Sequence, residues 1–119
     1  MPTPTVLVVD DDPVILRLLE VTFELEGFAV LVAHNGAEGI EAARAQRPDL
    51  VITDLTMPGV SGPDVVAALK GVDATQGIPI IVLSTTADAN DLATGADDEV
   101  TKPFEPSDLI GRANALLHR

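Results

Sequence analysis

The chain contains no cysteine. This absence excludes a disulfide framework, a thiolate nucleophile and a thiolate metal site, and it fits a reducing compartment. Long apolar runs are also absent, because the longest, such as residues 28–33, have six residues, whereas a helix needs roughly 20 to span a bilayer. No basic segment precedes a signal-like apolar core. We therefore expect a soluble cytoplasmic protein with no targeting segment and no membrane association.

Basic residues are few. Seven lysines and arginines stand against 19 aspartates and glutamates, so the net charge at pH 7 is −12. A protein that binds nucleic acid or anionic lipid needs a basic surface to neutralise phosphates. The charge balance therefore argues against direct nucleic-acid binding by this segment. The length of 119 residues suits one globular domain over residues 1–119.

The apolar residues form five short runs, which are rich in β-branched side chains and separated by helix-like stretches. Near-continuous hydrophobicity at strand length is typical of a parallel sheet that is covered on both faces. Strands that alternate with helices predict a right-handed, doubly wound α/β domain. In such a domain the functional residues lie beyond the carboxyl ends of the strands. The predicted strands cover residues 5–9, 28–33, 49–53, 78–84 and, more weakly, 99–101.

The first predicted helix covers residues 13–26. Asp12 is a good N-cap residue, Pro13 suits the first helical position, and Gly27 suits the position after the last turn. One arc of this helix is apolar and is predicted to cover the sheet. The residues on that arc are Ile15, Leu18, Leu19, Phe23 and Leu25.

Further helices are predicted after the second, third and fifth strands. Asn35 caps one that runs to about Gln46, another begins near Ser61, and the last opens at Glu105 and Pro106. A short, mobile helix is predicted over residues 87–95, where poor helix formers dominate. The last helix presents an apolar stripe of Leu109, Ile110, Ala113, Leu116 and Leu117.

Charged and polar residues follow the predicted strands. Asp10 and Asp11 follow the first strand, Asp54 the third and Lys102 the fifth, and Ser84 ends the fourth. A single aspartate at a strand end is usually a turn or helix-capping residue, but several on separate strands at one edge are harder to explain in that way. Clustered carboxylates repel one another unless a cation lies beside them or one is protonated. An all-oxygen donor set with open positions matches Mg2+.

Four segments of the chain closely resemble, in order, the receiver domain of two-component response regulators. They are Val8-Val9-Asp10-Asp11-Asp12, Asp54-Leu55-Thr56-Met57-Pro58-Gly59 with Gly62, Ile80-Ile81-Val82-Leu83-Ser84, and Gly95 to Asp98 through Lys102-Pro103-Phe104. The resemblance covers essentially the whole chain. It implies a flavodoxin-like sheet with strand order 2-1-3-4-5 and a cis peptide bond before Pro103.

The resemblance also implies a role for each strand-end residue. Asp54 would be the phosphoacceptor, and Mg2+ would be held by Asp10, Asp11, Asp54 and the backbone carbonyl of Thr56. Ser84 would hydrogen-bond the phosphoryl group, and Lys102 would take the place of the family's lysine. The phosphoryl donor would be a sensor histidine kinase or a histidine phosphotransfer protein. The receiver of the signal would be an output domain or a downstream protein, and the chain would catalyse only its own phosphorylation and dephosphorylation.

The chain departs from the family at two places. Glu99 occupies the position, three residues before Lys102, where receiver domains usually have an aromatic residue that transmits phosphorylation. A carboxylate does not readily enter an apolar slot, because burying it unpaired costs several kcal/mol. In addition, only 17 residues separate Ser84 from Lys102, about one helical turn fewer than in the family. These departures predict that the phosphate chemistry is retained and that signal relay is atypical.

Two alternatives remain open at this point. The first is a pseudo-receiver, in which the same fold serves as a docking module without phosphorylation. The second is a Mg2+-dependent phosphohydrolase, whose usual motif has a second aspartate two residues after the nucleophile. Thr56 occupies that place here. The complete acidic set together with Lys102 favours the phosphoacceptor over the pseudo-receiver, and Thr56 in place of the second aspartate makes the phosphohydrolase the weaker class.

Overall fold

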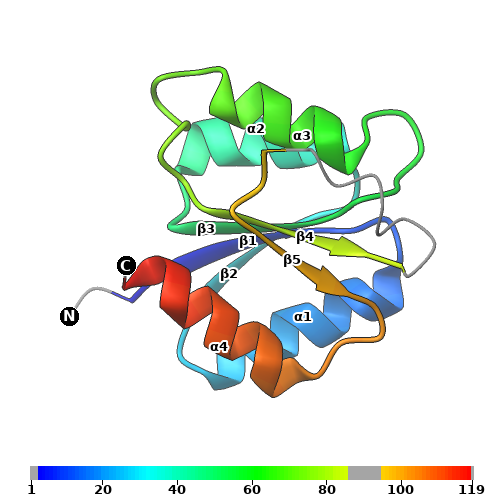
Figure 1. Ribbon diagram of the computed structural model, residues 1–119, viewed down its shortest axis with the longest axis vertical. Helices are drawn as coiled ribbons and strands as arrows, with labels where there is room; N and C mark the ends of the chain where they lie inside the picture. The colour runs from blue at the N-terminus through cyan, green and yellow to red at the C-terminus, as the bar shows by residue number, and fades with distance from the viewer. Residues whose placement is uncertain (1–2, 86–94, 119) are drawn as a thin grey trace.

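The computed structural model describes residues 3–85 and 95–118. Most of the helix predicted over 87–95 therefore lies outside the described residues. Within them, strands and helices alternate as predicted over residues 5–84 (Figure 1). The strands are β1 (Thr5–Val9), β2 (Ala29–Ala33), β3 (Leu50–Asp54), β4 (Ile80–Ser84) and β5 (Asp98–Thr101). The helices are α1 (Pro13–Leu25), α2 (Gly36–Gln46), α3 (Gly62–Lys70) and α4 (Pro106–Leu117).

The five strands form one parallel sheet in the order β2-β1-β3-β4-β5. This order confirms the predicted flavodoxin-like fold. Figure 1 shows α2 and α3 on one face of the sheet and α1 and α4 on the other. The connection that leaves β1 leads to β2 on one side of the sheet and the connection that leaves β3 leads to β4 on the other. The carboxyl ends of these two central strands therefore border the crevice where such folds bind ligands.

Each face of the sheet packs against its own pair of helices. Val8, Ile52 and Leu83 lie in the apolar cluster that contains α1 and α4, whereas Val9 and Val82 lie in the cluster that contains α2 and α3. Side chains alternate between faces along a strand. The central strands β1 and β3 are therefore apolar almost throughout, as the sequence predicts for a sheet covered on both faces.

The predicted helix caps are present. The side chain of Asp12 accepts a hydrogen bond from the backbone N–H of Val14 at 2.9 Å, and that of Asn35 accepts one from Glu38 at 2.8 Å. Gly27 has a φ of +88°, a conformation that glycine adopts without strain. These contacts satisfy N–H groups that have no partner within the helix. The bond between Lys102 and Pro103 is cis, as the resemblance implies.

The predicted apolar arc of α1 is partly wrong. Leu19 and Phe23 are buried as predicted, but Leu18 is 43% exposed and Leu25 is 81% exposed. Leu16, which is only 4% exposed, takes a core position instead. A helix turns by roughly 100° per residue, so Leu16, Leu19 and Phe23 share one stripe while Leu18 and Leu25 lie almost opposite it. The predicted apolar arc of α1 is therefore wider than the stripe that is buried.

The apolar stripe of α4 is as predicted. Leu109 and Ala113 are fully buried, and Ile110, Leu116 and Leu117 pack partly buried against the same cluster. None of the helices in residues 3–85 and 95–118 combines the length and the hydrophobicity needed to span a bilayer.

Candidate functional site

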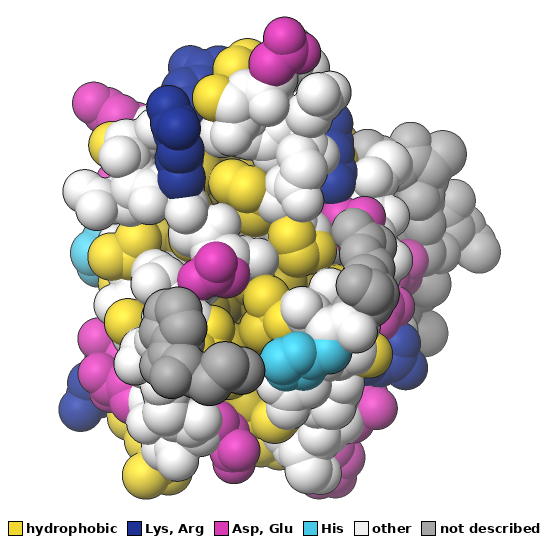
Figure 2. Space-filling model, turned by 90° about the vertical axis from the view of Figure 1, so that its left-hand side faces the viewer, with side chains coloured by type: hydrophobic (Ala, Val, Ile, Leu, Met, Phe, Trp, Pro, Cys, Tyr) yellow, Lys and Arg dark blue, Asp and Glu magenta, His cyan; other side chains and the backbone are white. Residues whose placement is uncertain are grey.

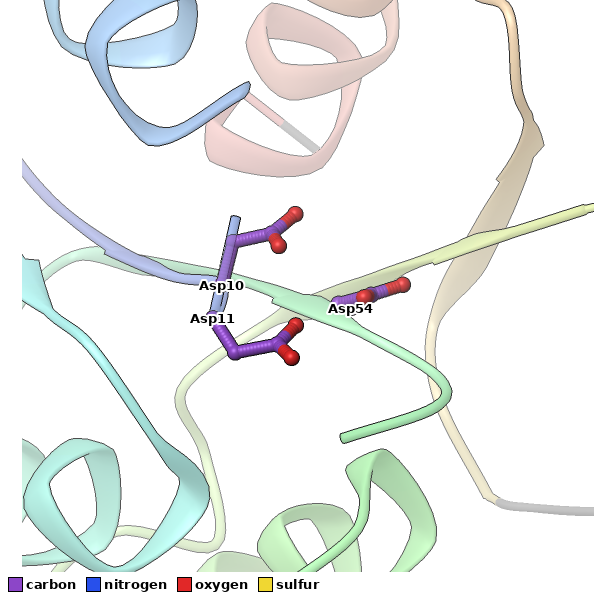
Figure 3. Close-up of side chains that lie close together, drawn as sticks. All are labelled: Asp10, Asp11 and Asp54. Carbon is purple, nitrogen blue, oxygen red and sulfur yellow. The ribbon is translucent and has the colours of Figure 1, made fainter. Parts of the chain in front are cut away.

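Three of the predicted site residues converge at the carboxyl ends of the two central strands. Asp10 and Asp11 follow β1, and Asp54 is the last residue of β3. One carboxylate oxygen from each lies within 4.8 Å of the others. Figure 3 shows the three side chains pointing into the same space. Asp10 is fully buried and Asp54 is 9% exposed, whereas Asp11 is open to solvent.

Local hydrogen bonds hold the two buried aspartates in place. One carboxylate oxygen of Asp10 accepts the backbone N–H of Asp12, the N-cap residue of α1, at 2.9 Å. Behind Asp54, the hydroxyl of Thr53 donates to the Asp54 carbonyl at 3.1 Å. The N–H of Leu55 donates to the carbonyl of Leu83 at 2.8 Å, which ties the end of β3 to β4.

Gly62 fixes the loop that follows Asp54. Its backbone N–H donates to the carbonyl of Leu55 at 2.9 Å. A Cβ atom added at Gly62 would clash with the Asp54 carbonyl and lie 2.7 Å from the Cα atom of Leu55. The first turn of α3 therefore packs directly against the backbone of the predicted phosphoacceptor, and only a residue without a side chain fits there.

Lys102 joins this cluster from the end of β5. Its Nζ atom lies 3.1 Å from a carboxylate oxygen of Asp54 and 3.3 Å from one of Asp10. Burial on its own would lower the pKa of Lys102, but the hydrogen bond to Asp54 and the charges of both aspartates outweigh it, so the pKa lies above its usual value. Lys102 is therefore positively charged at neutral pH.

One lysine does not balance three carboxylates. Burial raises the pKa of both Asp10 and Asp54, and neighbouring carboxylates add to this effect, namely Asp54 for Asp10 and Asp11 for Asp54. Lys102 opposes both shifts. The ionised cluster is therefore short of positive charge. A divalent cation would offset this deficit, and carboxylate oxygens at this spacing are the ligands that Mg2+ prefers. Thr56 lies two residues beyond Asp54 in an exposed part of the loop.

Ser84 has a partner that the sequence reasoning missed. It is fully buried at the end of β4, and its hydroxyl donates to a carboxylate oxygen of Glu99 at 3.2 Å. Glu99 lies opposite Val82 in the sheet, and Ser84 lies opposite Thr101. Residues paired in this way point to the same face, so Ser84 and Glu99 are diagonal neighbours. The sequence alone could not predict this contact, because it depends on the register in which β4 and β5 pair.

A hollow in the described surface lies away from the acidic cluster. It has a volume of about 360 Å³ and is lined by residues such as Pro4, Phe28 and Leu117. These residues precede β1, precede β2 and end α4, so the hollow lies at the opposite end of the strands from the acidic cluster. Figure 2 shows this face, where apolar side chains are exposed between acidic and histidine side chains. It contributes nothing to the chemistry of the cluster.

The family model of the response regulator receiver domain matches residues 6–114. The chain is a member of the response regulator receiver domain family. Receiver domains are signalling domains of two-component systems rather than enzymes acting on other substrates, and they bind Mg2+ at an acidic pocket. In this receiver, Asp10, Asp11 and Asp54 form a cluster of acidic side chains at the carboxyl ends of the central strands.

Relatives in sequence are longer proteins. The DNA-binding response regulator MtrA of Mycolicibacterium smegmatis is 42% identical over 118 residues, which is 96% of this chain and 50% of MtrA. The transcriptional regulatory protein PrrA of Mycobacterium tuberculosis is 42% identical over 121 residues, which is 98% of this chain and 51% of PrrA. This receiver therefore spans about half the length of the curated relatives it matches.

Solved structures share the fold over nearly the whole chain. The receiver domain of a signal transduction histidine kinase from Syntrophus aciditrophicus has a TM-score of 0.90 and 32% identity, and the match covers 97% of this chain and 90% of that one. The chemotaxis protein CheY4 of Vibrio cholerae has a TM-score of 0.88 and 28% identity, with 97% and 99% covered.

Proposed function

We propose that this receiver is a phosphoacceptor switch, which takes a phosphoryl group onto Asp54 from a phosphohistidine in a sensor histidine kinase or a histidine phosphotransfer protein. The observation that supports this most is the position of the Asp54 carboxylate. It lies beside two further carboxylates and 3.1 Å from the ammonium group of Lys102. A nucleophile in this setting has both a cation site and a fixed positive charge next to the incoming phosphorus.

The proposed reaction is a single displacement. A carboxylate oxygen of Asp54 forms a bond to phosphorus, and the bond from phosphorus to the imidazole nitrogen breaks with its electron pair left on that nitrogen. Transfer through a loose transition state needs little covalent assistance, so positioning and charge stabilisation supply most of the acceleration. Water later attacks the phosphorus of the acyl phosphate, which releases inorganic phosphate and restores the carboxylate.

Each of the surrounding residues has its own proposed role. Asp10, Asp11, Asp54 and the backbone carbonyl of Thr56 are the proposed ligands of Mg2+. When bound, this ion neutralises phosphoryl oxygens and reduces their repulsion from the aspartates. The ammonium group of Lys102 lies beside the Asp54 carboxylate before transfer and would lie beside a phosphoryl oxygen afterwards. Ser84, at the end of the neighbouring strand, is the proposed hydroxyl donor to the phosphoryl group.

The partners and the extent of the domain belong to the same proposal. Residues 1–119 would constitute one receiver domain in the cytoplasm, whose phosphorylation changes a surface read by an output domain or a downstream protein. The relatives MtrA and PrrA are named for DNA binding and transcriptional regulation, so an output of that kind is proposed for this receiver. Direct nucleic-acid contact by this segment is not proposed, because its net charge is −12.

Signal relay is proposed to be atypical, because Glu99 occupies the position of the usual aromatic residue. Its carboxylate is partly buried and bonded to Ser84, which is an arrangement that an aromatic ring would not make. A phosphohydrolase remains the weaker alternative, because Thr56 has no carboxylate to act as the acid or base of such an enzyme.

The test is the intact mass of the protein after incubation with Mg2+ and acetyl phosphate or phosphoramidate. The wild type is expected to gain one phosphoryl group, and the Asp54→Asn variant none. Asp73→Asn serves as the matched control, because Asp73 is exposed in the loop before β4, at the other end of the strands. Chelation of the metal is expected to prevent the gain.

Two results would contradict the proposal. A wild type that gains no mass would favour the pseudo-receiver that only docks. An equal gain in the wild type and in Asp54→Asn would place the phosphoryl group on another residue.

A further inference from the structure

The hydrogen bond between Ser84 and Glu99 connects the proposed phosphoryl site to β5, one of the two edge strands of the sheet. Ser84 is fully buried, and its hydroxyl donates to Glu99 at 3.2 Å. The backbone of Ser84 is tied to the same strand, because its carbonyl accepts the N–H of Lys102 at 2.6 Å. The serine hydroxyl is therefore engaged before any phosphoryl group arrives.

A serine hydroxyl carries one proton, so it donates one strong hydrogen bond at a time. Asp54 lies opposite Leu83, the residue directly before Ser84, and a phosphoryl group on Asp54 would bring several acceptor oxygens to this edge of the sheet. The phosphoryl oxygens and the Glu99 carboxylate are both anionic acceptors. They therefore compete for the same proton.

We propose that Glu99 is a positioning residue that holds the Ser84 hydroxyl in the unphosphorylated state and releases it when Asp54 is phosphorylated. This inference rests on the proposed function, because it needs a phosphoryl group at Asp54. The competition lowers the affinity of the site for the phosphoryl group, and the exchange leaves the Glu99 carboxylate without its hydroxyl partner. Signal relay would then consist of a change in the hydrogen bonding of the Glu99 carboxylate on β5. It would replace the movement of the aromatic ring that receiver domains usually have at this position.

The surroundings of Glu99 support this assignment. The side chain of its neighbour Asp98 bonds to Arg112 of α4 at 3.0 Å, on the other face of the sheet. Lys102 is engaged with Asp10 and Asp54. Among the residues that the structure describes, no ion pair holds Glu99, so the serine hydroxyl is the side-chain donor that fixes it.

The inference is tested with Mg2+ and beryllofluoride, which mimics a phosphoryl group on aspartate. Because the chain has no tryptophan, binding is followed by fluorine NMR. Glu99→Ala removes the competing acceptor and is expected to bind beryllofluoride roughly fivefold more tightly than the wild type. Glu99→Gln keeps the size of the side chain and a weaker, neutral acceptor, so an intermediate gain is expected.

A double-mutant cycle separates competition from the loss of a negative charge. In the Ser84→Ala background the gain from Glu99→Ala should fall below twofold, because there is no hydroxyl left to compete for. Asp98→Asn removes one charge from the adjacent position without touching Ser84, and its effect should also stay below twofold. In labelled protein, the carboxyl carbon resonance of Glu99 should shift when beryllofluoride binds to the wild type, and should not shift in Ser84→Ala.

Three outcomes would overturn the inference. Equal affinities of the wild type, Glu99→Ala and Glu99→Gln would show that Glu99 does not compete, and phosphorylation of Asp54 would stand. An equal gain with or without the Ser84 hydroxyl would show that only charge matters. A wild type that binds no beryllofluoride with Mg2+ would remove both this inference and the proposed function.

Discussion

The central strands and the edge strand β5 of this receiver place acidic side chains in different surroundings. At the ends of β1 and β3, Asp10 and Asp54 lie within reach of a third carboxylate and share one lysine. On β5, the partly buried Glu99 has a neutral hydroxyl as its partner. The first arrangement is short of positive charge and calls for a cation, whereas the second is satisfied as it stands.

This difference shows where the domain can change without losing its chemistry. β1 and β3 are covered on both faces, so a changed residue there disturbs the core and the acidic cluster together. β5 has a neighbouring strand on one side only, where Glu99 is partly buried and Thr101 is exposed. A departure such as Glu99 is tolerated at this edge, and we expect it to alter signal relay more than phosphorylation itself.

The largest expected contrast between the two regions comes from Lys102→Met. This variant should slow phosphorylation by acetyl phosphate about 100-fold or more, because removing one preorganised donor to a developing anion has an effect of that size. Glu99→Ala should change the same rate by less than about tenfold, the size expected from one competing hydrogen bond. Rates are measured by intact mass over time at a fixed Mg2+ concentration. Similar losses of phosphorylation rate in Lys102→Met and Glu99→Ala would contradict the predicted difference between the two residues.

A smaller contrast is expected between two glycines. Gly62→Ala should lower the free energy of unfolding by about 1–3 kcal/mol, because its Cβ atom forces the loop away from Asp54 and Leu55. Gly111 lies exposed within α4 with no atom near its Cβ position, so Gly111→Ala should raise the free energy of unfolding by about 0.5–1 kcal/mol. Urea unfolding monitored by circular dichroism measures both. Equal effects would mean that Gly62 does not constrain the site.

The smallest effect concerns the acidic cluster without metal. Because burial raises the pKa of Asp10 and Asp54 in the folded state, the folded protein holds these protons more tightly than the unfolded chain does. Its stability therefore falls as the pH rises from the ordinary carboxyl pKa through the raised values. At pH 7 and without metal, Asp54→Asn should be more stable than the wild type by about 1 kcal/mol, since it removes one repelling charge.

Mg2+ provides the control for that prediction. The ion should stabilise the wild type and have much less effect on Asp54→Asn, because it binds the folded cluster and not the unfolded chain. The control Asp73→Asn should behave as the wild type does. A metal-free wild type that is more stable than Asp54→Asn would show that Lys102 already balances the cluster.

Much of the fold was predictable because its signals are local. Asp12 and Asn35 cap their helices as the sequence indicates, and buried parallel strands appear as continuous apolar runs. The width of the buried stripe on α1 was not predictable in the same way. Leu18 and Leu25 are as apolar as Leu16, and only the packing of α1 against the sheet decides which of them are buried.

Neighbours along the chain are enough to establish the alternation of strands and helices and the residue types at the strand ends, because hydrophobic spacing and helix capping act within a few residues. The strand order was implied by the resemblance to the receiver family and not by those local patterns. That three carboxylates meet within 4.8 Å, that Lys102 contacts two of them and that Ser84 bonds to Glu99 became known only from the folded chain. The reason is that these contacts join strands distant in sequence, and their distances depend on the register in which the strands pair.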